Sequence, residues 1–295
     1  MKAIFIGSVE FSLGLLDVVK NSPLIDIVGL VTKETSTFNS DFADLSKSFK
    51  GQECPEVFYF KNNSEEMSSW IQQKAPDVIF CLGWSHLLPE AALKIPPKGA
   101  IGYHPAALPS NRGRHPIIWA LCLGLKTTAS TFFLIKPGVD EGDILSQMNV
   151  PILESDYAQD LYNKLKVAAI SQLKDLIEEL VNNRVQPKSQ EHLPSNFWRK
   201  RSKEDGRIDW RMSARSIYNL VRALAPPYPG AFFQWDESAV PVNRSQIISA
   251  AGLENRIPGE VIECTDVHID IKTGDDLIRI EFNGIDTTIK KGDFL

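Results

Sequence analysis

The chain of 295 residues is poor in cysteine and has no long apolar run. Its four cysteines, Cys54, Cys81, Cys122 and Cys264, show no CxxC spacing, which argues against a zinc site and against a disulfide framework. Cys81 and Cys122 lie in apolar stretches and are expected to be buried free thiols. No stretch approaches the ~20 apolar residues that span a bilayer, and the N-terminus lacks the pattern of a signal peptide. We therefore expect a cytoplasmic protein with no membrane partner.

The chain also has no excess of positive charge. Its net charge is -5, which gives no bulk reason to expect a nucleic-acid partner. Hydrophobic residues make up 43% and charged residues 23%, as in ordinary globular proteins. The length suits one large domain and one smaller domain.

A dinucleotide-binding GxGxxG motif is missing after the first apolar run, which continues as GSVEFSLG. Short apolar runs alternate with helical segments, such as the one near Phe11–Lys20, and this alternation predicts an α/β fold with a doubly wound, mostly parallel, Rossmann-like sheet. Such sheets bind ligands beyond the carboxyl ends of their strands, here after Leu82 and after Tyr103. The expected strands are Lys2–Ile6, Ile25–Val31, Asp77–Leu82, Ala100–Tyr103, Ser130–Leu134 and Ile144–Met148.

The spacing of apolar residues in Tyr157–Val181 predicts a long helix that closes a first domain, residues 1–190. A polar, basic connecting segment that lies on the surface, residues 191–210, is expected next. Residues 211–295 begin with a helix over Ser213–Leu224 and continue as short β-rich runs, which predicts a smaller, open-barrel-like C-terminal domain.

Two polar side chains stand where this fold places active sites. The strand from Ala100 ends at His104, and Asp140 lies in the turn KPGVDEGD between the next two expected strands. A histidine held by an aspartate is a workable general base with a fixed tautomer. Taken singly, a histidine at a strand end is more often structural, and an aspartate between glycines usually makes a turn.

Together these segments resemble the formyltransferase family. Gly99–Pro109, followed by Arg112 and Gly113, resembles the signature I-N-x-H-x-S-L-L-P followed by RG, and Val139–Asp143 resembles the signature D-x-G-D. The resemblance continues through Gly206–Trp210 and Asn219–Phe232 and covers nearly the whole chain. Family members include methionyl-tRNA formyltransferase and enzymes that formylate UDP- or dTDP-linked amino sugars, and the sugar branch is the more similar.

The resemblance implies a mechanism and a formyl donor, N10-formyltetrahydrofolate. An amine attacks the formyl carbon, His104 manages the proton, and Asp140 holds and polarises His104. The family asparagine that stabilises the oxyanion falls at Gly102. Three explanations stay open: an impaired enzyme, a backbone amide or water as substitute donor, or a protonated His104 as the donor. Our hypothesis is the third, aided by water.

The resemblance also implies that the folate contacts two loops. One follows Leu82, and the other precedes the catalytic aspartate. Trp84 could equally pack in the core. His86 has no partner at metal-ligand spacing, so no metal is expected. The expected cofactor-binding residues are Trp84, Ser85, His86, Leu87, Leu88, Val139 and Asp140.

Basic and aromatic residues are candidates for binding an anionic substrate. Arg112 and Arg114 precede a helix that begins near Pro116, and such helix starts favour a pyrophosphate. Arg201 and Arg222 are secondary candidates, although the charge run around Arg201 could simply be solvated. Tyr228 could stack on a base or close the turn PPYPG.

Three functions follow from these features. The first is an N-formyltransferase for a nucleotide-linked amino sugar, a 4-amino-4,6-dideoxy sugar of a surface polysaccharide or flagellin glycan. The second is a methionyl-tRNA formyltransferase, disfavoured by the net charge and by an acidic C-terminal region, since tRNA binding needs many phosphate contacts. The third is a non-catalytic folate or nucleotide binder, suggested by Gly102. Bacterial relatives make a homodimer plausible.

Overall fold

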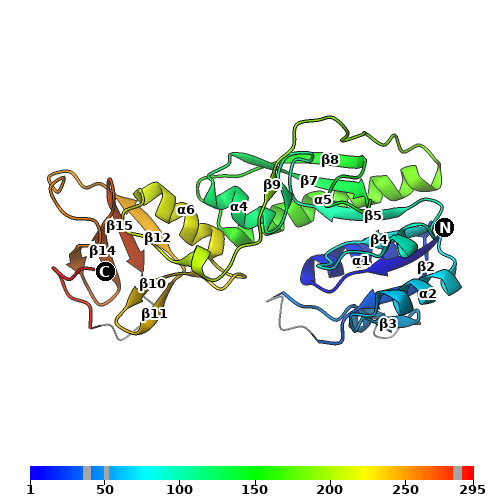
Figure 1. Ribbon diagram of the computed structural model, residues 1–295, viewed down its shortest axis with the longest axis horizontal. Coiled ribbons are helices and arrows are strands. Elements are labelled where there is room, and N and C mark those ends of the chain that lie inside the picture. Colours follow the sequence, from blue (N-terminus) through cyan, green and yellow to red (C-terminus); the bar gives the residue numbers. More distant parts are fainter. Residues whose placement is uncertain (36–40, 50–52, 282–287) are drawn as a thin grey trace. The chain divides into compact units, whose positions relative to one another are not determined.

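The computed structural model describes residues 1–35, 41–49, 53–281 and 288–295 (Figure 1). The chain forms two compact units. Unit 1 consists of Met1–Pro116, Thr128–Val150 and Asn163–Trp198, and unit 2 of Ile117–Thr127, Pro151–Tyr162 and Arg199–Leu295. Each unit therefore combines segments that are distant in the sequence. The division at residues 190 and 210 expected above stays a prediction.

Unit 1 is built on a seven-stranded sheet with the order β3-β2-β1-β4-β5-β7-β8. The pairs β2–β3, β1–β2, β1–β4 and β4–β5 are parallel, and β5 pairs antiparallel with β7. The expectation of a mostly parallel α/β sheet is confirmed. Its strands are β1 (Lys2–Ile6), β2 (Asp26–Thr32), β3 (Val57–Tyr59), β4 (Val78–Cys81), β5 (Ala100–His104), β7 (Thr127–Leu134) and β8 (Ile144–Pro151).

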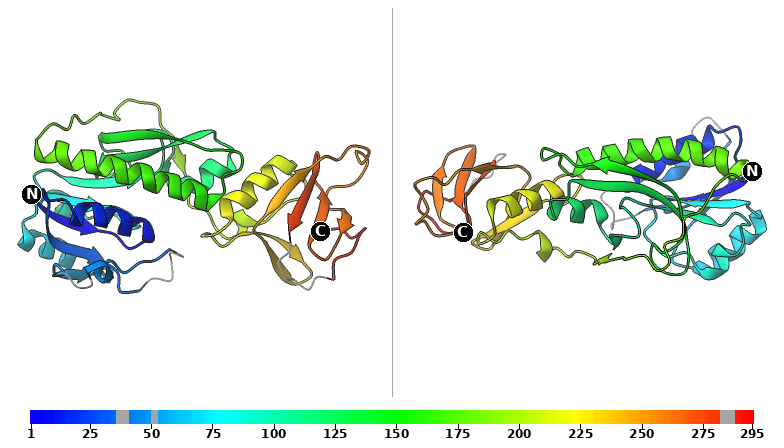
Figure 2. Two further views of the ribbon diagram at one scale, coloured as in Figure 1. Left: turned by 180° about the vertical axis from the view of Figure 1, so that it is seen from behind. Right: turned by 90° about the horizontal axis from the view of Figure 1, so that it is seen from above.

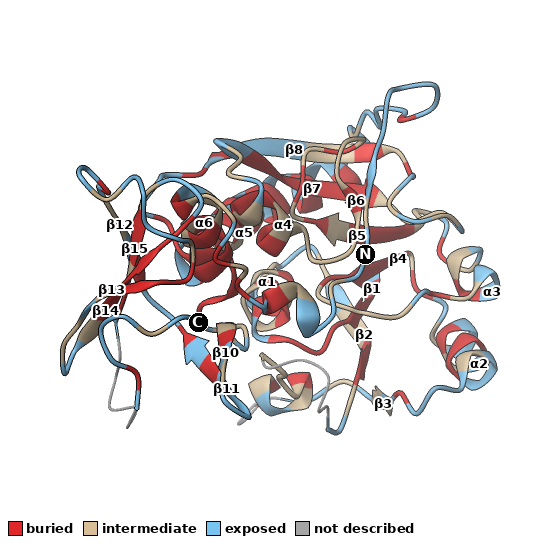
Figure 3. Cartoon of the chain, turned by 60° about the vertical axis from the view of Figure 1, so that its left-hand side comes forward, coloured by how far each residue is buried: buried red, intermediate tan, exposed pale blue. Residues whose placement is uncertain are grey.

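Successive side chains of a strand point to opposite faces, and consecutive residues of β1 and β4 are buried, so both faces of the sheet are covered there. In β1, Ile4 and Ile6 join a buried cluster with Met67 and Ile71 of α2 (Ser64–Lys74). Helices α1 (Glu10–Lys20) and α5 (Ala158–Val181) lie side by side (Figure 2), where a side chain at Gly14 would contact Lys166. Figure 3 shows the resulting burial of the strands. The other helices of unit 1 are α3 (Glu90–Leu93) and the 3-10 helix η1 (Leu45–Phe49), whereas α4 (Pro116–Cys122) belongs to unit 2 apart from its first residue.

A buried serine ties the start of α1 to the loop that follows β4. The hydroxyl of Ser12, which is fully buried, donates to the carbonyl oxygen of Leu82 at 2.6 Å. The backbone N–H of Ser8 donates to the carbonyl oxygen of Gly83 at 3.2 Å. A loop held at two successive carbonyl groups gives the residues after Leu82 a defined position.

The polar segment after α5 contacts unit 1 at two points, one within the expected linker and one at residue 190, the last of the expected first domain. Its strand β9 (Phe197–Trp198) pairs in parallel with β6 (Arg112–Gly113). Gln190 is only 2% exposed, although its neighbours in the sequence are largely exposed. This segment is therefore anchored to unit 1 through specific polar contacts.

Unit 2 contains α6 (Ala214–Leu224), which Ser213 caps by accepting a hydrogen bond from the N–H of Ser216 at 3.1 Å. Its strands are antiparallel, which confirms a β-rich C-terminal region. They form one pair, β10–β11, and one sheet with the order β12-β15-β14-β13. The bounds are η2 (Glu204–Gly206), β10 (Ala231–Trp235), β11 (Ser238–Val242), β12 (Ser245–Ile248), β13 (Val261–Cys264), β14 (His268–Lys272) and β15 (Leu277–Glu281).

The four cysteines are free thiols, and burial raises the pKa of Cys81 to about 12 and that of Cys122 to about 11. Within the described ranges, no helix has both the length and the apolar character needed to cross a membrane.

We predict a large difference in stability between two truncations on α5. Leu165 is 1% exposed and Val167 is 70% exposed. Leu165→Ala should lower the free energy of unfolding by about 2–5 kcal/mol, because it leaves a cavity. Val167→Ala should change it by less than about 0.5 kcal/mol. Urea denaturation measures both, and equal losses would contradict the packing of α5 described here.

Candidate active site

The site centres on a histidine and an aspartate that the fold brings into contact. His104 ends β5, and its side chain is 6% exposed. Asp140 lies in the turn between β7 and β8, with its Oδ2 atom 3.5 Å from Nδ1 of His104. The structure therefore places these two sequence candidates together in unit 1.

The surroundings of the His104 ring constrain its protons. Nε2 lies 2.8 Å from the carbonyl oxygen of Asn111, which only accepts, so Nε2 must carry a proton for this hydrogen bond. The neutral ring then presents an unprotonated Nδ1 to the carboxylate of Asp140, at a distance longer than a hydrogen bond. Only a ring protonated at both nitrogens could donate to both neighbours.

The turn around Asp140 is held by its own backbone and by the loop after β5. Asp140 has a left-handed backbone conformation, with φ of 53°. Its Oδ2 atom accepts a hydrogen bond of 2.9 Å from the N–H of Gly113. A side chain at Gly142 would overlap the carbonyl oxygen of Leu134, so the glycine of the D-x-G-D signature is sterically required. One carboxylate oxygen thus faces both His104 and Gly113.

Gly102 lies two residues before His104 on β5, and the side-chain space above it is occupied. An added Cβ would lie 2.9 Å from Cγ1 of Ile135 and 3.0 Å from Cζ of Phe133. Phe133 is 5% exposed and packs with Leu108, Ile144 and Ile135 in an apolar cluster. An asparagine at this position would need these side chains to move. The departure from the family signature is therefore built into the packing beside the site.

The loop after β4 carries an aromatic cluster. The rings of Trp84 and His86 lie 5.4 Å apart, and Phe60 lies 5.4 Å from Trp84 and 5.3 Å from His86. Nε1 of Trp84 is buried and has no hydrogen-bond partner among the described residues. Nζ of Lys33 lies 5.9 Å from the centre of the Trp84 ring. The loop thus offers aromatic faces with a cation beside them.

The other expected folate residues differ in exposure. Leu87 is 72% exposed, whereas Leu88 is 8% exposed and belongs to the core cluster of the sheet. Val139 is 42% exposed beside Asp140. The carbonyl oxygen of Ser85 accepts a hydrogen bond of 3.3 Å from Nη1 of Arg114. Leu88 therefore has a packing role, and the exposed positions are Leu87 and Val139.

Arg112 and Arg114 have different surroundings. Arg112 is 8% exposed, stacks 5.8 Å from the ring of Phe197 and donates from Nη2 to Oε1 of Gln190 at 2.8 Å. Its Nε is buried without a partner among the described residues. Arg114 is partly exposed and lies with the loop of Ser85 and His86. Arg114 is thus the more available of the two cations for an anionic ligand.

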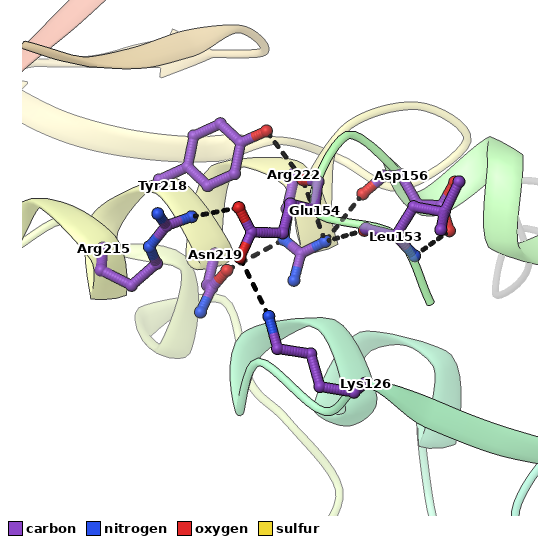
Figure 4. A network of polar contacts seen from close by, with 8 residues as sticks. All are labelled: Lys126, Leu153, Glu154, Asp156, Arg215, Tyr218, Asn219 and Arg222. Carbon is purple, nitrogen blue, oxygen red and sulfur yellow. Dashed lines mark hydrogen bonds and ion pairs between the residues drawn. The ribbon is translucent and has the colours of Figure 1, made fainter. Parts of the chain in front are cut away.

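The remaining substrate candidates belong to unit 2. The guanidinium of Arg222 is buried, and its Nη1 donates to the carbonyl oxygens of Leu153 and Asp156 at 3.0 and 3.1 Å (Figure 4). Arg201 lies 4.7 Å from the centre of the Trp119 ring and donates to the carbonyl oxygen of Asp205 at 2.5 Å. Tyr228 is partly buried in the turn after α6. Arg222 is therefore committed to holding residues 153–156 against α6.

Two residues at the site were missed from the sequence. Asn111 supplies the carbonyl oxygen that faces His104, and Gln190 donates to the carbonyl oxygens of Asp140 and Gly142. Asn111 contacts the site through its backbone carbonyl group, and Gln190 donates to backbone carbonyl groups. Such contacts leave no pattern in residue type or spacing.

One group of acidic and histidine side chains has the proximity of metal ligands among the described residues: Glu263, His268 and Asp270 in unit 2. Arg279 already forms two hydrogen bonds of 2.7 Å with the Asp270 carboxylate and lies 3.8 Å from Glu263. The guanidinium of Arg279 thus supplies the positive charge that lies against these carboxylates.

The buried His104 and the part-exposed Asp140 lie beyond the end of a strand in an open α/β sheet, which is where such sheets bind ligands. A family model described as "Formyl transferase" matches residues 2–177, and one described as "Formyl transferase, C-terminal domain" matches residues 200–283. The chain therefore belongs to the formyl transferase family, and the expected enzyme class is confirmed.

Two curated relatives with different names are similar to this chain. The chain is 35% identical over 70% of its length to the bifunctional polymyxin resistance protein ArnA of Wigglesworthia glossinidia brevipalpis, of which the match spans 32%. It is 29% identical to the methionyl-tRNA formyltransferase of Caldanaerobacter subterraneus subsp. tengcongensis, over 95% of this chain and 91% of the relative.

Solved structures share the fold. The N-formyltransferase from Helicobacter canadensis, in complex with folinic acid and dTDP-3-aminofucose, superposes with a TM-score of 0.71 at 17% identity, covering 95% of this chain and 99% of the other. WlaRD, a sugar 3N-formyltransferase in the presence of dTDP and 5-N-formyl-THF, gives a TM-score of 0.69 at 18% identity, covering 95% and 97%.

We predict that Gly102 resists substitution. Gly102→Ala should lower the free energy of unfolding by about 1–3 kcal/mol because the methyl group presses on Phe133 and Ile135. Gly206→Ala is the control, since its Cβ would meet nothing closer than 3.3 Å. Gly102→Asn should destabilise more and should not raise turnover. A Gly102→Asn variant with wild-type stability and a rate gain of several orders of magnitude would show that the wild-type site lacks a substitute donor.

We also predict that the pKa of His86 depends on the positive charges beside it. Its pKa is lowered from 6.5 by burial first, and then by the charges of Lys33 and Arg114. Because the folded state disfavours the protonated ring, this group lowers stability as the pH falls below its unfolded pKa. Lys33→Met should raise the pKa of His86 in an NMR titration, and Lys94→Met should leave it unchanged. An unchanged pKa in Lys33→Met would contradict the proximity of Lys33.

Proposed function

We propose that this protein transfers the formyl group of N10-formyltetrahydrofolate to the amine of a UDP- or dTDP-linked amino sugar. The observation that carries the proposal is the contact of 3.5 Å between the buried His104 ring and Asp140, in a chain of the formyl transferase family. The folate ligands named for two structures of the same fold support the choice of donor.

In the proposed reaction the amine nitrogen attacks the formyl carbon and forms a C–N bond. The carbonyl becomes an oxyanion, the amine loses a proton, and collapse breaks the bond from carbon to N10 of the folate, which gains a proton. For this step Nε2 leaves the carbonyl oxygen of Asn111, and the proton of the neutral ring lies on Nδ1, toward Asp140. His104 then accepts the amine proton at Nε2 and returns a proton to N10. Asp140 orients the ring and stabilises its charged form. The products are the formamide and tetrahydrofolate.

The oxyanion needs a donor that Gly102 cannot provide from a side chain. Losing one such donor costs about 10²–10³ in rate when nothing replaces it. The Nε2–H of His104 already acts as a donor, toward the carbonyl oxygen of Asn111. We propose that a water molecule serves the oxyanion, joined by the Nε2–H of His104 once the ring has taken up the amine proton and is no longer bonded to Asn111.

The donor folate is proposed to bind at the loop after β4, against Trp84, Ser85, His86 and Leu87, with Val139 nearby. The aromatic cluster and the flanking cations Lys33 and Arg114 suit a ligand with ring systems and carboxylates. Arg114 is proposed to serve anion binding in unit 1. Arg201 and Tyr228 stay predictions from the sequence, while Arg112 and Arg222 are proposed as structural.

A nucleotide sugar is proposed over tRNA because of charge. The net charge is -5, and acidic residues are frequent after residue 259. Binding tRNA requires basic side chains for many phosphates. Methionyl-tRNA formyltransferase stays the second candidate because relatives of that name match 95% of the chain. A 4-amino-4,6-dideoxy sugar, a role in surface-glycan synthesis, a cytoplasmic location and a homodimer belong to the proposal as predictions.

The test is a formylation assay with a panel of UDP- and dTDP-linked amino sugars and charged initiator tRNA. We expect folate consumption with an amino sugar. His104→Ala and Asp140→Asn should each lower kcat by about 10²–10⁴, and Val167→Ala should not. Turnover with tRNA alone would replace the sugar with the second candidate. Folate binding without turnover on any substrate would instead indicate a non-catalytic binder.

A further inference from the structure

Gln190 is a buried amide that contacts the turn of Asp140. It is 2% exposed and lies in the segment between α5 and β9. Its Nε2 donates to the carbonyl oxygen of Asp140 at 3.0 Å and to that of Gly142 at 2.5 Å. Both amide hydrogens are thus used to close a turn in which Asp140 has a left-handed backbone.

The other end of the same amide contacts the loop after β5. Oε1 of Gln190 accepts a hydrogen bond of 2.8 Å from Nη2 of Arg112, which is 8% exposed. The next residue, Gly113, donates its N–H to the Asp140 carboxylate. A single buried side chain therefore joins the two loops whose separation sets the distance between His104 and Asp140.

The chain on both sides of Gln190 is fixed to the start of β8, just after the Asp140 turn, and to the loop after β5. Before it, Lys188 exchanges two backbone hydrogen bonds of 2.8 Å with Ile144. After it, the Oδ1 atom of Asn196 accepts a hydrogen bond of 2.8 Å from the N–H of Asn111, whose carbonyl oxygen faces His104. The amide is consequently held in place and is not free to follow a relaxing turn.

We propose that Gln190 is a positioning residue for the His104–Asp140 pair. Removing its donors takes a hydrogen bond from the part-buried carbonyl group of Asp140 and from the buried one of Gly142, and the turn must shift to hydrate them. Oδ2 of Asp140 then moves relative to Nδ1 of His104. The expected change in kcat rests on the proposed function, whereas the expected displacement of Asp140 relative to His104 does not.

The test compares two nearly isosteric substitutions of buried glutamines. Gln190→Met removes the amide at the site. Gln172→Met is the matched control, because Gln172 is 4% exposed and donates to Ser130 and Ser146 on β7 and β8, and to neither loop. Gln190→Glu is the second variant: it retains an acceptor for Arg112 and lacks the two donors, so it also serves if Gln190→Met fails to fold.

The first readout is the ¹⁵N NMR signal of the His104 ring, assigned among the five histidines by its loss in His104→Asn. It should shift in Gln190→Met and Gln190→Glu and stay in place in Gln172→Met. An unshifted signal in a folded Gln190 variant, or an equal shift in the control, would overturn the proposal.

The second readout is steady-state kinetics with the substrate found in the panel. Both Gln190 variants should lose ~10–100-fold in kcat with KM nearly constant, because a small misplacement of reacting groups slows the chemical step. A loss confined to KM, or equal losses in Gln172→Met, would overturn the positioning role. A ring shift in a protein that formylates no substrate would reject the proposed function and retain the role of Gln190 in holding the pair.

Discussion

The contact between the His104 ring and the Asp140 carboxylate is the constraint on which the site depends. The position of the pair does not depend on a single segment of the chain. His104 ends a buried strand, whereas Asp140 stands in a left-handed turn between the next two strands of the sheet. The turn is held by the backbone N–H of Gly113 and by the amide of Gln190. A pair assembled from three segments of chain has a geometry that each of them can disturb.

The packing beside this pair explains why the chain departs from its family at Gly102. Phe133 and Ile135 occupy the space that an asparagine side chain would need. The apolar cluster around Phe133 also includes Leu108, in the loop after His104, and Ile144, the first residue of β8 after the Asp140 turn. The packing that excludes a side-chain oxyanion donor thus supports the two loops. In the proposed mechanism His104 and water stabilise the oxyanion, and the His104 ring faces two acceptors in the structure.

Periodicity predicted the framework well and the polar contacts poorly. The run Lys2–Ile6 and the end of α5 at Val181 match the structure residue by residue, because apolar spacing reports burial directly. The strand β3 (Val57–Tyr59) was missed because three residues carry too little pattern. His104 and Asp140 were found through family signatures. Gln190 stands at the edge of a polar segment expected to be exposed, and the burial of Gln190 and Arg112 was not predicted, because burial of single polar side chains depends on tertiary contacts that composition does not encode.

The most direct test of the account is a double-mutant cycle between His104 and Asp140, measured as kcat/KM for formyl transfer. Residues that act as one unit give strongly non-additive effects. The account predicts that His104→Ala combined with Asp140→Asn is about as slow as His104→Ala alone, because Asp140 acts only through the imidazole. Losses that multiply in the double variant would show that the two side chains act independently and would contradict the account.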